Sequence, residues 1–196
     1  MIIRKSADEL QAMRRAGLVV ARARELVREM VRPGVTTLQL DQAVEEFFRR
    51  ENAIPAFKGY HGYPATICAS VNEVVVHGIP SADQVLEEGS IISVDIGAFV
   101  DGFCGDSAWT YPVGRVSEEV QVLLRVGEEA LYRGIAQAVV GNRLSDISHA
   151  VQQHAESYGF SVVRDFVGHG VGRQMHEEPQ IPNFGPPGRG PRLKVG

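Results

Sequence analysis

Hydrophobic and polar residues alternate most regularly over residues 91–111, where we predict two β-strands joined by a turn at Val100-Asp101-Gly102. An Asp-Gly pair between β-branched and aromatic runs is typical of a hairpin turn. Alternate positions on the first strand form an apolar face and a polar face, made by Ile92, Val94 and Ile96 and by Ser93, Asp95 and Gly97.

The polar face of this hairpin carries two carboxylates. Counting outward from the turn places Asp106 opposite Asp95, within one position of register, so we expect the two groups about 5 Å apart on one face. Such a pair is repulsive unless one carboxyl is protonated, an Arg or Lys lies between them, or a cation does. The alternative is that the aspartates only flank a turn and that a one-residue slip separates them.

Helical periodicity dominates the segments on both sides of the hairpin. A capping-box pattern at residues 6–9 precedes a predicted helix that ends at Pro33-Gly34, and a second helix is predicted from Thr37 to near Asn52. Further helices are predicted over 117–140 and 145–158, and β-like segments over 65–69, 74–76 and 161–167. The inward face of the first helix is expected to comprise Leu10, Met13, Gly17, Val20, Val27 and Met30.

The order of helix, helix and strands occurs twice, which indicates a weak internal repeat. We therefore expect one domain over residues 1–196, with halves of about 1–112 and 113–196. The second half offers one strand after its helices where the first offers several, so the repeat is expected to be incomplete.

Composition excludes several classes of protein. A net charge of −4 argues against a general DNA or RNA binder, although residues 1–32 hold eight Lys or Arg against four Asp or Glu. That basic helix suits an anionic surface such as ribosomal RNA, or is simply a solvated face. No signal peptide or membrane-length apolar run occurs, and two cysteines are too few for a disulfide scaffold. We expect a cytoplasmic monomer with reduced thiols.

Histidines supply the other candidate chemistry. His77 follows a β-branched run and precedes Gly-Ile-Pro, which suits a positioned imidazole or an ordinary turn residue. His169 lies between glycines, which permit close backbone approach, and His176 follows seven residues later. One interpretation is that His169 binds a metal and His176 contacts substrate; the other is a glycine loop with incidental histidines. His149 and His154 are expected at the surface.

Two strand carboxylates and a glycine-loop histidine would form a mixed oxygen and nitrogen ligand set. Such a set suits Mn, Fe, Co or Zn. Two bridged cations could generate a nucleophilic water and polarise a carbonyl, so amide or ester hydrolysis is the natural reaction class. The cluster Tyr60-His61-Gly62-Tyr63-Pro64 is expected to line an apolar pocket or to pack a loop, and Cys68 is expected to be a small buried residue.

Several separated motifs, in order, together resemble the bacterial type I methionine aminopeptidases. They are Ser70–Pro80 (SVNEVVVHGIP), Ser93–Gly97 (SVDIG), Gly102–Ser107 (GFCGDS), Gly168–Gly172 (GHGVG) and His176–Pro179 (HEEP). The resemblance implies the pita-bread α/β fold, a pseudo-twofold mixed or antiparallel sheet with helices on its outer face. It also implies removal of the initiator methionine from nascent chains with a small second residue.

The resemblance further implies the roles of individual residues. Asp95, Asp106 and His169 would be ligands of two divalent metal ions, and His77 and His176 would hydrogen-bond the substrate and the tetrahedral intermediate. The methionine pocket would be lined by Tyr60, His61, Tyr63, Cys68 and Met175. The family usually has an aromatic residue where this chain has Met175, so we expect a reshaped pocket.

The family pattern also includes two glutamate ligands that would follow residue 196, so we expect this sequence to be a fragment of a longer enzyme. Two alternatives remain. One is a proline-type aminopeptidase on the same fold, and the other is a catalytically inactive or fragmentary protein that uses the fold for binding.

Overall fold

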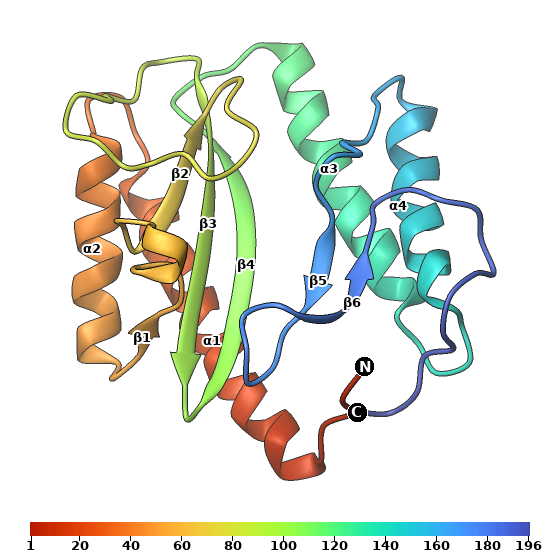
Figure 1. Cartoon of the computed structure of the whole chain (residues 1–196). Helices are drawn as coiled ribbons and strands as arrows, with labels where there is room; N and C mark the ends of the chain where they lie inside the picture. Colours follow the sequence, from red (N-terminus) through yellow and green to blue (C-terminus); the bar gives the residue numbers. More distant parts are fainter. The chain divides into compact units, whose positions relative to one another are not determined.

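The computed structural model describes residues 1–196, which form two compact units. The sheet unit comprises residues 7–117 and 171–175, and the helix-pair unit comprises residues 1–6, 118–170 and 176–196. Figure 1 shows the elements of both units. The single domain expected from the sequence stays a prediction.

The sheet unit is built around β3 (Ile91–Val100), which pairs antiparallel with every other strand of its sheet. Its partners are β1 (Ile54–Pro55), β2 (Ile67–Val71) and β4 (Phe103–Pro112). In Figure 1, β3 and β4 run side by side as the two longest strands. The predicted hairpin is therefore confirmed and forms the centre of this unit.

The register of the hairpin differs from our count by two residues. Asp101 and Gly102 alone form the turn, both with positive φ (52° and 76°), so Val100 pairs with Phe103. Asp95 consequently faces Ala108, and Asp106 faces Gly97. Because side chains alternate with a period of two, this even shift leaves both aspartates on the same face.

The apolar face of the sheet packs against α1 (Ala7–Met30), and α2 (Thr37–Arg50) contributes to the same core. Thr36 and Gln39 form a capping box at the start of α2. Leu40, Val44 and Phe48 of α2 are buried. The core comprises mainly Val19, Val20, Ala23, Val27, Leu40, Val44, Phe48, Ile67, Leu86, Ile92, Val94, Ile96 and Tyr111.

The predicted inward face of α1 was partly wrong. Leu10 and Gly17 are exposed, and alanines such as Ala16 and Ala23 are buried instead. Small side chains let the helix approach the sheet closely: a Cβ on Gly105 of β4 would lie 2.7 Å from the carbonyl carbon of Ala16. The side of α1 that packs on the sheet is therefore set by how closely the two backbones can approach. It cannot be identified from the largest apolar residues of the helix alone.

The strand predicted over 74–76 is absent. After β2 the chain turns at Asn72, which has φ 52° and whose side-chain oxygen accepts a hydrogen bond from the Ile91 N–H at 3.0 Å. Val74, Val75 and Val76 follow in an exposed loop without strand pairing. Gly78 instead returns to β2, where its carbonyl accepts the Ala69 N–H at 2.8 Å.

The helix-pair unit consists of α3 (Glu118–Gln137), α4 (Leu144–Ser157) and the two short antiparallel strands β5 (Gly168–Gly170) and β6 (Glu177–Ile181). Both helices were predicted within a few residues of their ends. They approach closely where Gly134 meets Val151, since a Cβ on Gly134 would lie 2.8 Å from that valine's Cγ2.

Two predictions for this unit were wrong. Residues 161–167 form no strand, because no neighbouring strand pairs with them, and Val163 and Phe166 are exposed. His154 is buried, although it was expected at the surface: its Nε2 lies 2.8 Å from Glu129 Oε2, and its ring packs edge-on against Tyr158.

None of the helices combines the length and the hydrophobicity that a membrane-crossing segment requires.

The contact between α1 and β4 makes a testable prediction about stability. Gly105→Ala would force its Cβ into the backbone of Ala16 and Gly17, so we expect a loss of about 1–3 kcal/mol in the free energy of unfolding. Urea denaturation measures the loss. Gly17→Ala is the matched control, because its Cβ meets nothing within 4 Å and alanine favours a helix by about 0.5–1 kcal/mol. Equal stability of both variants would contradict the close packing.

Candidate functional site

The polar face of the sheet carries Asp95 on β3 and Asp106 on β4, both half-buried. Diagonal neighbours on an antiparallel pair lie about 7–8 Å apart at their backbones, within reach of two carboxyl side chains. The two groups do meet, because Asp106 forms a side-chain hydrogen bond with Asp95. A hydrogen bond between two carboxyls requires that one of them carries the proton.

Burial, the charge of Asp95 and this hydrogen bond together raise the pKa of Asp106 well above the usual range for an aspartate. The repulsion predicted from the sequence is therefore present, and in the metal-free chain a shared proton relieves it. Oxygen ligands that repel one another fit a divalent cation, which would replace the proton. Within the sheet unit, no third His, Cys, Asp or Glu joins the pair to form a group that could hold a metal ion.

A second cluster of buried residues lies on the same face as the aspartates. Cys68 of β2 pairs with Asp95 across the strands, and Cys104 of β4 pairs with Phe99 of β3. The buried members of the cluster are Ala56, Phe57, Cys68, Cys104 and Met175, with Tyr63, Phe99 and Val171 packed against them. The structure thus brings together three predicted pocket residues, Tyr63, Cys68 and Met175, beside the carboxylate pair.

Sequence reasoning missed Phe57, Phe99 and Cys104 in this cluster. Strand alternation could have identified Phe99, which lies four residues after Asp95 and so faces the same side. Phe57 had no such signal. It packs over Gly97, where a Cβ would lie 2.7 Å from the Phe57 ring, so the glycine admits an aromatic residue next to the aspartates.

The two cysteines of this cluster are not activated nucleophiles. Burial, together with the smaller effect of the nearby aspartates, raises the pKa of Cys68 to about 11 and that of Cys104 to about 12. Neutral thiols behave as small apolar groups, in agreement with the prediction for Cys68. The cluster therefore offers an apolar surface beside a pair of carboxyl groups.

The remaining predicted residues of the sheet unit lie nearer the solvent. His77 is exposed and has a left-handed backbone, with φ 59°. Tyr60 and His61 are exposed in the short 3-10 turn η1 (Tyr60–Gly62), with ring centroids 4.3 Å apart. Their contribution to a substrate pocket stays a prediction.

The two other predicted histidines lie together in the helix-pair unit. His169 is on β5, and its ring centroid is 4.1 Å from that of His176, which immediately precedes β6. Nδ1 of His169 lies 3.0 Å from the Gly170 carbonyl oxygen. Since a carbonyl only accepts, Nδ1 donates in this contact, which leaves Nε2 as the ring nitrogen that could bind a metal ion.

A largely buried ion pair involves Glu177, the residue that follows His176. Lys5 Nζ lies 2.7 Å from Glu177 Oε2, and both side chains are largely buried. The register of β5 and β6 shifts between His169 and Gly170, which then pairs with Glu177. A Cβ on Gly170 would lie 2.7 Å from the Glu178 carbonyl oxygen, so the glycine permits this approach of the two strands.

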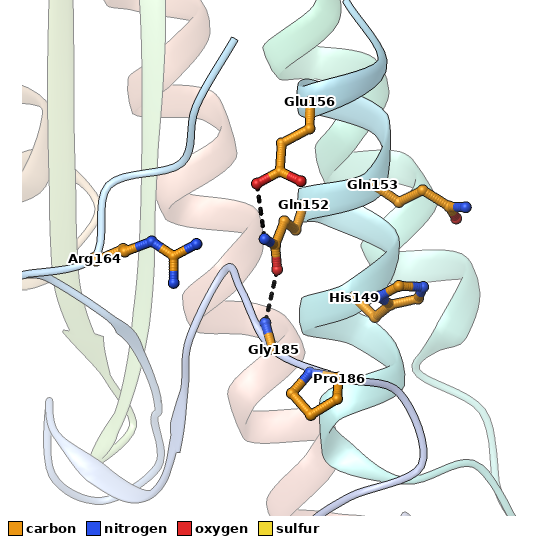
Figure 2. A pocket seen from close by; sticks show the side chains of 7 residues that line it. All are labelled: His149, Gln152, Gln153, Glu156, Arg164, Gly185 and Pro186. Atoms are coloured by element: carbon orange, nitrogen blue, oxygen red, sulfur yellow. Dashed lines mark hydrogen bonds between the residues drawn. The ribbon is translucent and has the colours of Figure 1, made fainter. Parts of the chain in front are cut away.

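The helix-pair unit also has an open hollow of about 410 Å³ beside α4, shown in Figure 2. Gln152 bridges it: its amide donates to Glu156 Oε1 at 2.7 Å, and its oxygen accepts the Gly185 N–H at 2.8 Å. No predicted site residue lines this hollow, which is formed where the loop containing Gly185 and Pro186 crosses the helix.

Comparison with known proteins places these features in a family. The sequence pattern of metallopeptidase family M24 matches residues 11–196. Methionine aminopeptidase 1 of Bacillus subtilis is 55% identical over 196 residues, which are 100% of this chain and 79% of that protein. The crystal structure of methionine aminopeptidase from Thermotoga maritima superposes with a TM-score of 0.96 at 48% identity, over 99% of this chain and 78% of that one.

A more distant structure shares the fold alone. The prolidase from Pyrococcus furiosus has a TM-score of 0.80 at 22% identity, over 93% of this chain and 52% of its own. These likenesses confirm the α/β pita-bread fold predicted from the sequence. The identity to the two methionine aminopeptidases, over nearly the whole of this chain, also confirms the resemblance given by the five motifs. The chain therefore belongs to metallopeptidase family M24, among the methionine aminopeptidases.

Proposed function

We propose that this chain removes the N-terminal methionine from polypeptides whose second residue is small, by metal-dependent hydrolysis of the first peptide bond. The observation that carries the proposal is the half-buried pair of Asp95 and Asp106 beside the apolar cluster of Tyr63, Cys68 and Met175. A charged pair next to an apolar surface is what a peptidase that reads a methionine side chain requires. Family membership supports the same reaction.

As a member of a metallopeptidase family, the chain depends on divalent metal. We assign Asp95, Asp106 and His169 as ligands of two ions, chosen among Co, Mn, Fe and Zn by the oxygen and nitrogen donor set. The raised pKa of Asp106 and the donation by His169 Nδ1 to the Gly170 carbonyl support these assignments. The bound metal supplies a water nucleophile at neutral pH and polarises the carbonyl that is attacked.

The chain's own residues bind and orient the substrate. His77 and His176 are assigned to hydrogen-bond the peptide and the oxygen that gains charge during attack, which an imidazole can do without large movement. Tyr63, Cys68 and Met175 accept the methionine side chain through apolar contact, with Tyr60 and His61 at the pocket entrance. Met175 is flexible, so the pocket can adjust to its occupant.

The proposed partner is the N-terminus of a nascent polypeptide. We accordingly propose that the reaction occurs in the cytoplasm and that the chain acts as a monomer. A contact between basic α1 and ribosomal RNA is not favoured. Arg15 pairs with Asp101 at 2.7 Å, Arg28 pairs with Glu25, and Arg24 stacks on Trp109 at 4.4 Å. These pairings favour the interpretation that the basic side of α1 is a solvated surface over the interpretation that it binds RNA.

Substrate preference tests the proposed function against the two alternatives. We expect the chain, loaded with Mn or Co, to release methionine from Met-Ala-x peptides and to leave x-Pro peptides intact. The reason is that the apolar cluster of Tyr63, Cys68 and Met175 is proposed to accept a methionine side chain. Chromatography of the products measures both reactions. Faster cleavage of x-Pro peptides would favour a proline-type aminopeptidase, and no cleavage of either with no metal bound would favour a binding protein.

Removal of one ligand charge tests the metal assignment. Asp106→Asn is expected to lower metal-dependent methionine release at least about 1000-fold, because metal-ion stabilisation of several kcal/mol is lost. Asp101→Asn is the matched control, since Asp101 is exposed in the hairpin turn and should leave release unchanged. Release by Asp106→Asn at the rate of the control would rule out the ligand assignment.

The same substitution should stabilise the metal-free chain at high pH. The folded pKa of Asp106 is raised, so the stability that its protonated form provides is present at low pH and is lost as pH rises through that pKa. Asn cannot ionise, so Asp106→Asn should lose less stability than the unmodified chain as pH rises from 3.8 to about 8. Urea denaturation in EDTA measures this, with Asp101→Asn expected to follow the unmodified chain. Parallel pH curves for all three proteins would contradict the raised pKa.

A further inference from the structure

We propose that Ser70, with the hydroxyl of Tyr63, is a positioning residue that clamps Gly78 against β2 and thereby sets the direction of the His77 imidazole. The inference rests on the proposed function, in which His77 contacts the substrate. Ser70 itself touches no substrate; it acts through the backbone of the residue that follows His77.

Three hydrogen bonds hold Gly78 to β2 and to Tyr63. Its N–H donates to Ser70 Oγ at 3.1 Å, and its carbonyl accepts the Ala69 N–H at 2.8 Å. The Tyr63 hydroxyl lies 2.9 Å from the same carbonyl and 2.9 Å from that of Ile67, so its one proton is shared between a strand residue and the loop. Both polar groups of the Gly78 backbone are therefore bound to β2 or to the residue that packs on it.

The approach of Gly78 to β2 is closer than any side chain would allow. A Cβ at this position would lie 2.2 Å from the Ala69 carbonyl oxygen and 2.9 Å from the Ser70 Cα. Such contact with backbone atoms cannot be relieved by moving a flexible side chain. Gly78 is therefore fixed against β2 at one position, which also fixes the backbone of His77, the residue before it.

His77 needs this support because its backbone is in the left-handed region, with φ 59°. Residues other than glycine adopt this conformation at an energetic cost and keep it only where the surroundings enforce it. Val74, Val75 and Val76 before it are exposed and lie in no strand, whereas Gly78 after it is hydrogen-bonded to β2. The His77 imidazole is therefore exposed but held in a defined direction, because Gly78 fixes the strained backbone that carries it.

Ser70 also connects His77 to the carboxylate pair. It is 3% exposed, and it lies two residues after Cys68 on β2, hence on the face shared with Asp95. The strand that forms the wall of the apolar cluster therefore also anchors the histidine loop. Ser70 therefore does more than supply a hydrogen-bond partner at the edge of the sheet.

Three substitutions separate positioning from simple structural support. Ser70→Ala removes the acceptor for the Gly78 N–H, and Ser70→Thr restores a hydroxyl. Ser93→Ala is the matched control, because Ser93 pairs with Ser70 across the strands but its hydroxyl contacts Thr110 Oγ1 at 2.8 Å and not the loop. We expect Ser70→Ala to lower kcat for a Met-Ala-x peptide about 10- to 100-fold with KM changed less than about twofold. Ser70→Thr should recover most of the loss, and Ser93→Ala should match the unmodified chain.

A double-mutant cycle shows whether the effect passes through His77. If it does, Ser70→Ala should cost little further activity in a His77→Ala background, so the two losses are not additive. Additive losses, or an unimpaired Ser70→Ala variant beside an impaired His77→Ala variant, would overturn the positioning role and leave the proposed function intact. A His77→Ala variant with full activity would overturn both the role of His77 and its positioning.

A second readout does not depend on catalysis. Amide hydrogen exchange at Gly78 and NMR relaxation of the His77 imidazole should report at least about tenfold faster exchange and a more mobile ring in Ser70→Ala, with neither change in Ser93→Ala. If the unmodified chain releases no methionine, the proposed function fails while these signals still decide the clamp. Unchanged exchange and an unchanged ring in Ser70→Ala would sink the clamp whatever the activity.

Discussion

The sheet unit depends on one constraint: two carboxyl groups are held close together on one face of an antiparallel hairpin. Asp106 keeps a raised pKa because burial and Asp95 both oppose its charge, and the metal-free chain has to hold a proton between them. A fold tolerates such repulsion only if the strands cannot spread apart. The long ladder between β3 and β4, and the partners of β3 along its length, provide that rigidity.

The opposite face of the same hairpin supplies the rest of the rigidity. Gly105 lies between Cys104 and Asp106, and it lets the backbone of α1 approach β4 more closely than any other residue would. Tyr111 adds a hydrogen bond from its hydroxyl to the Arg24 carbonyl at 3.0 Å. A site that opposes two like charges is thus backed by an apolar core with little freedom to relax, which is how strained functional groups persist in a stable fold.

Close approach at a glycine recurs beside several of the predicted functional residues. Gly97 admits Phe57 beside the aspartates, Gly78 lies against β2 next to His77, and Gly170 meets the carbonyl of Glu178 beside the histidines. In each case the glycine leaves room for backbone or an aromatic ring, and the neighbouring polar residue is placed as a result. The site is therefore determined by where side chains are missing as much as by the groups that react.

Local patterns in the sequence were sufficient for several elements. The Asp-Gly turn and period-two alternation determined the hairpin and the shared face of Asp95 and Asp106, and the motifs around His77, His169 and His176 identified the family. These features depend on dihedral preferences and on side-chain alternation, both of which act over a few residues.

Other features depended on contacts between distant segments. The two-residue correction to the register, the alanine face of α1, the coil at 74–76 and 161–167, and the burial of His154 against Glu129 all required the tertiary structure. An apolar β-branched run becomes a strand only if another strand pairs with its backbone groups, and a helix buries the face that its partner lets approach. By itself, the sequence determined which chemical groups this protein carries and which of them share a strand face. Only the tertiary structure decided which backbones come close enough to hold those groups in place, because that depends on residues far apart along the chain.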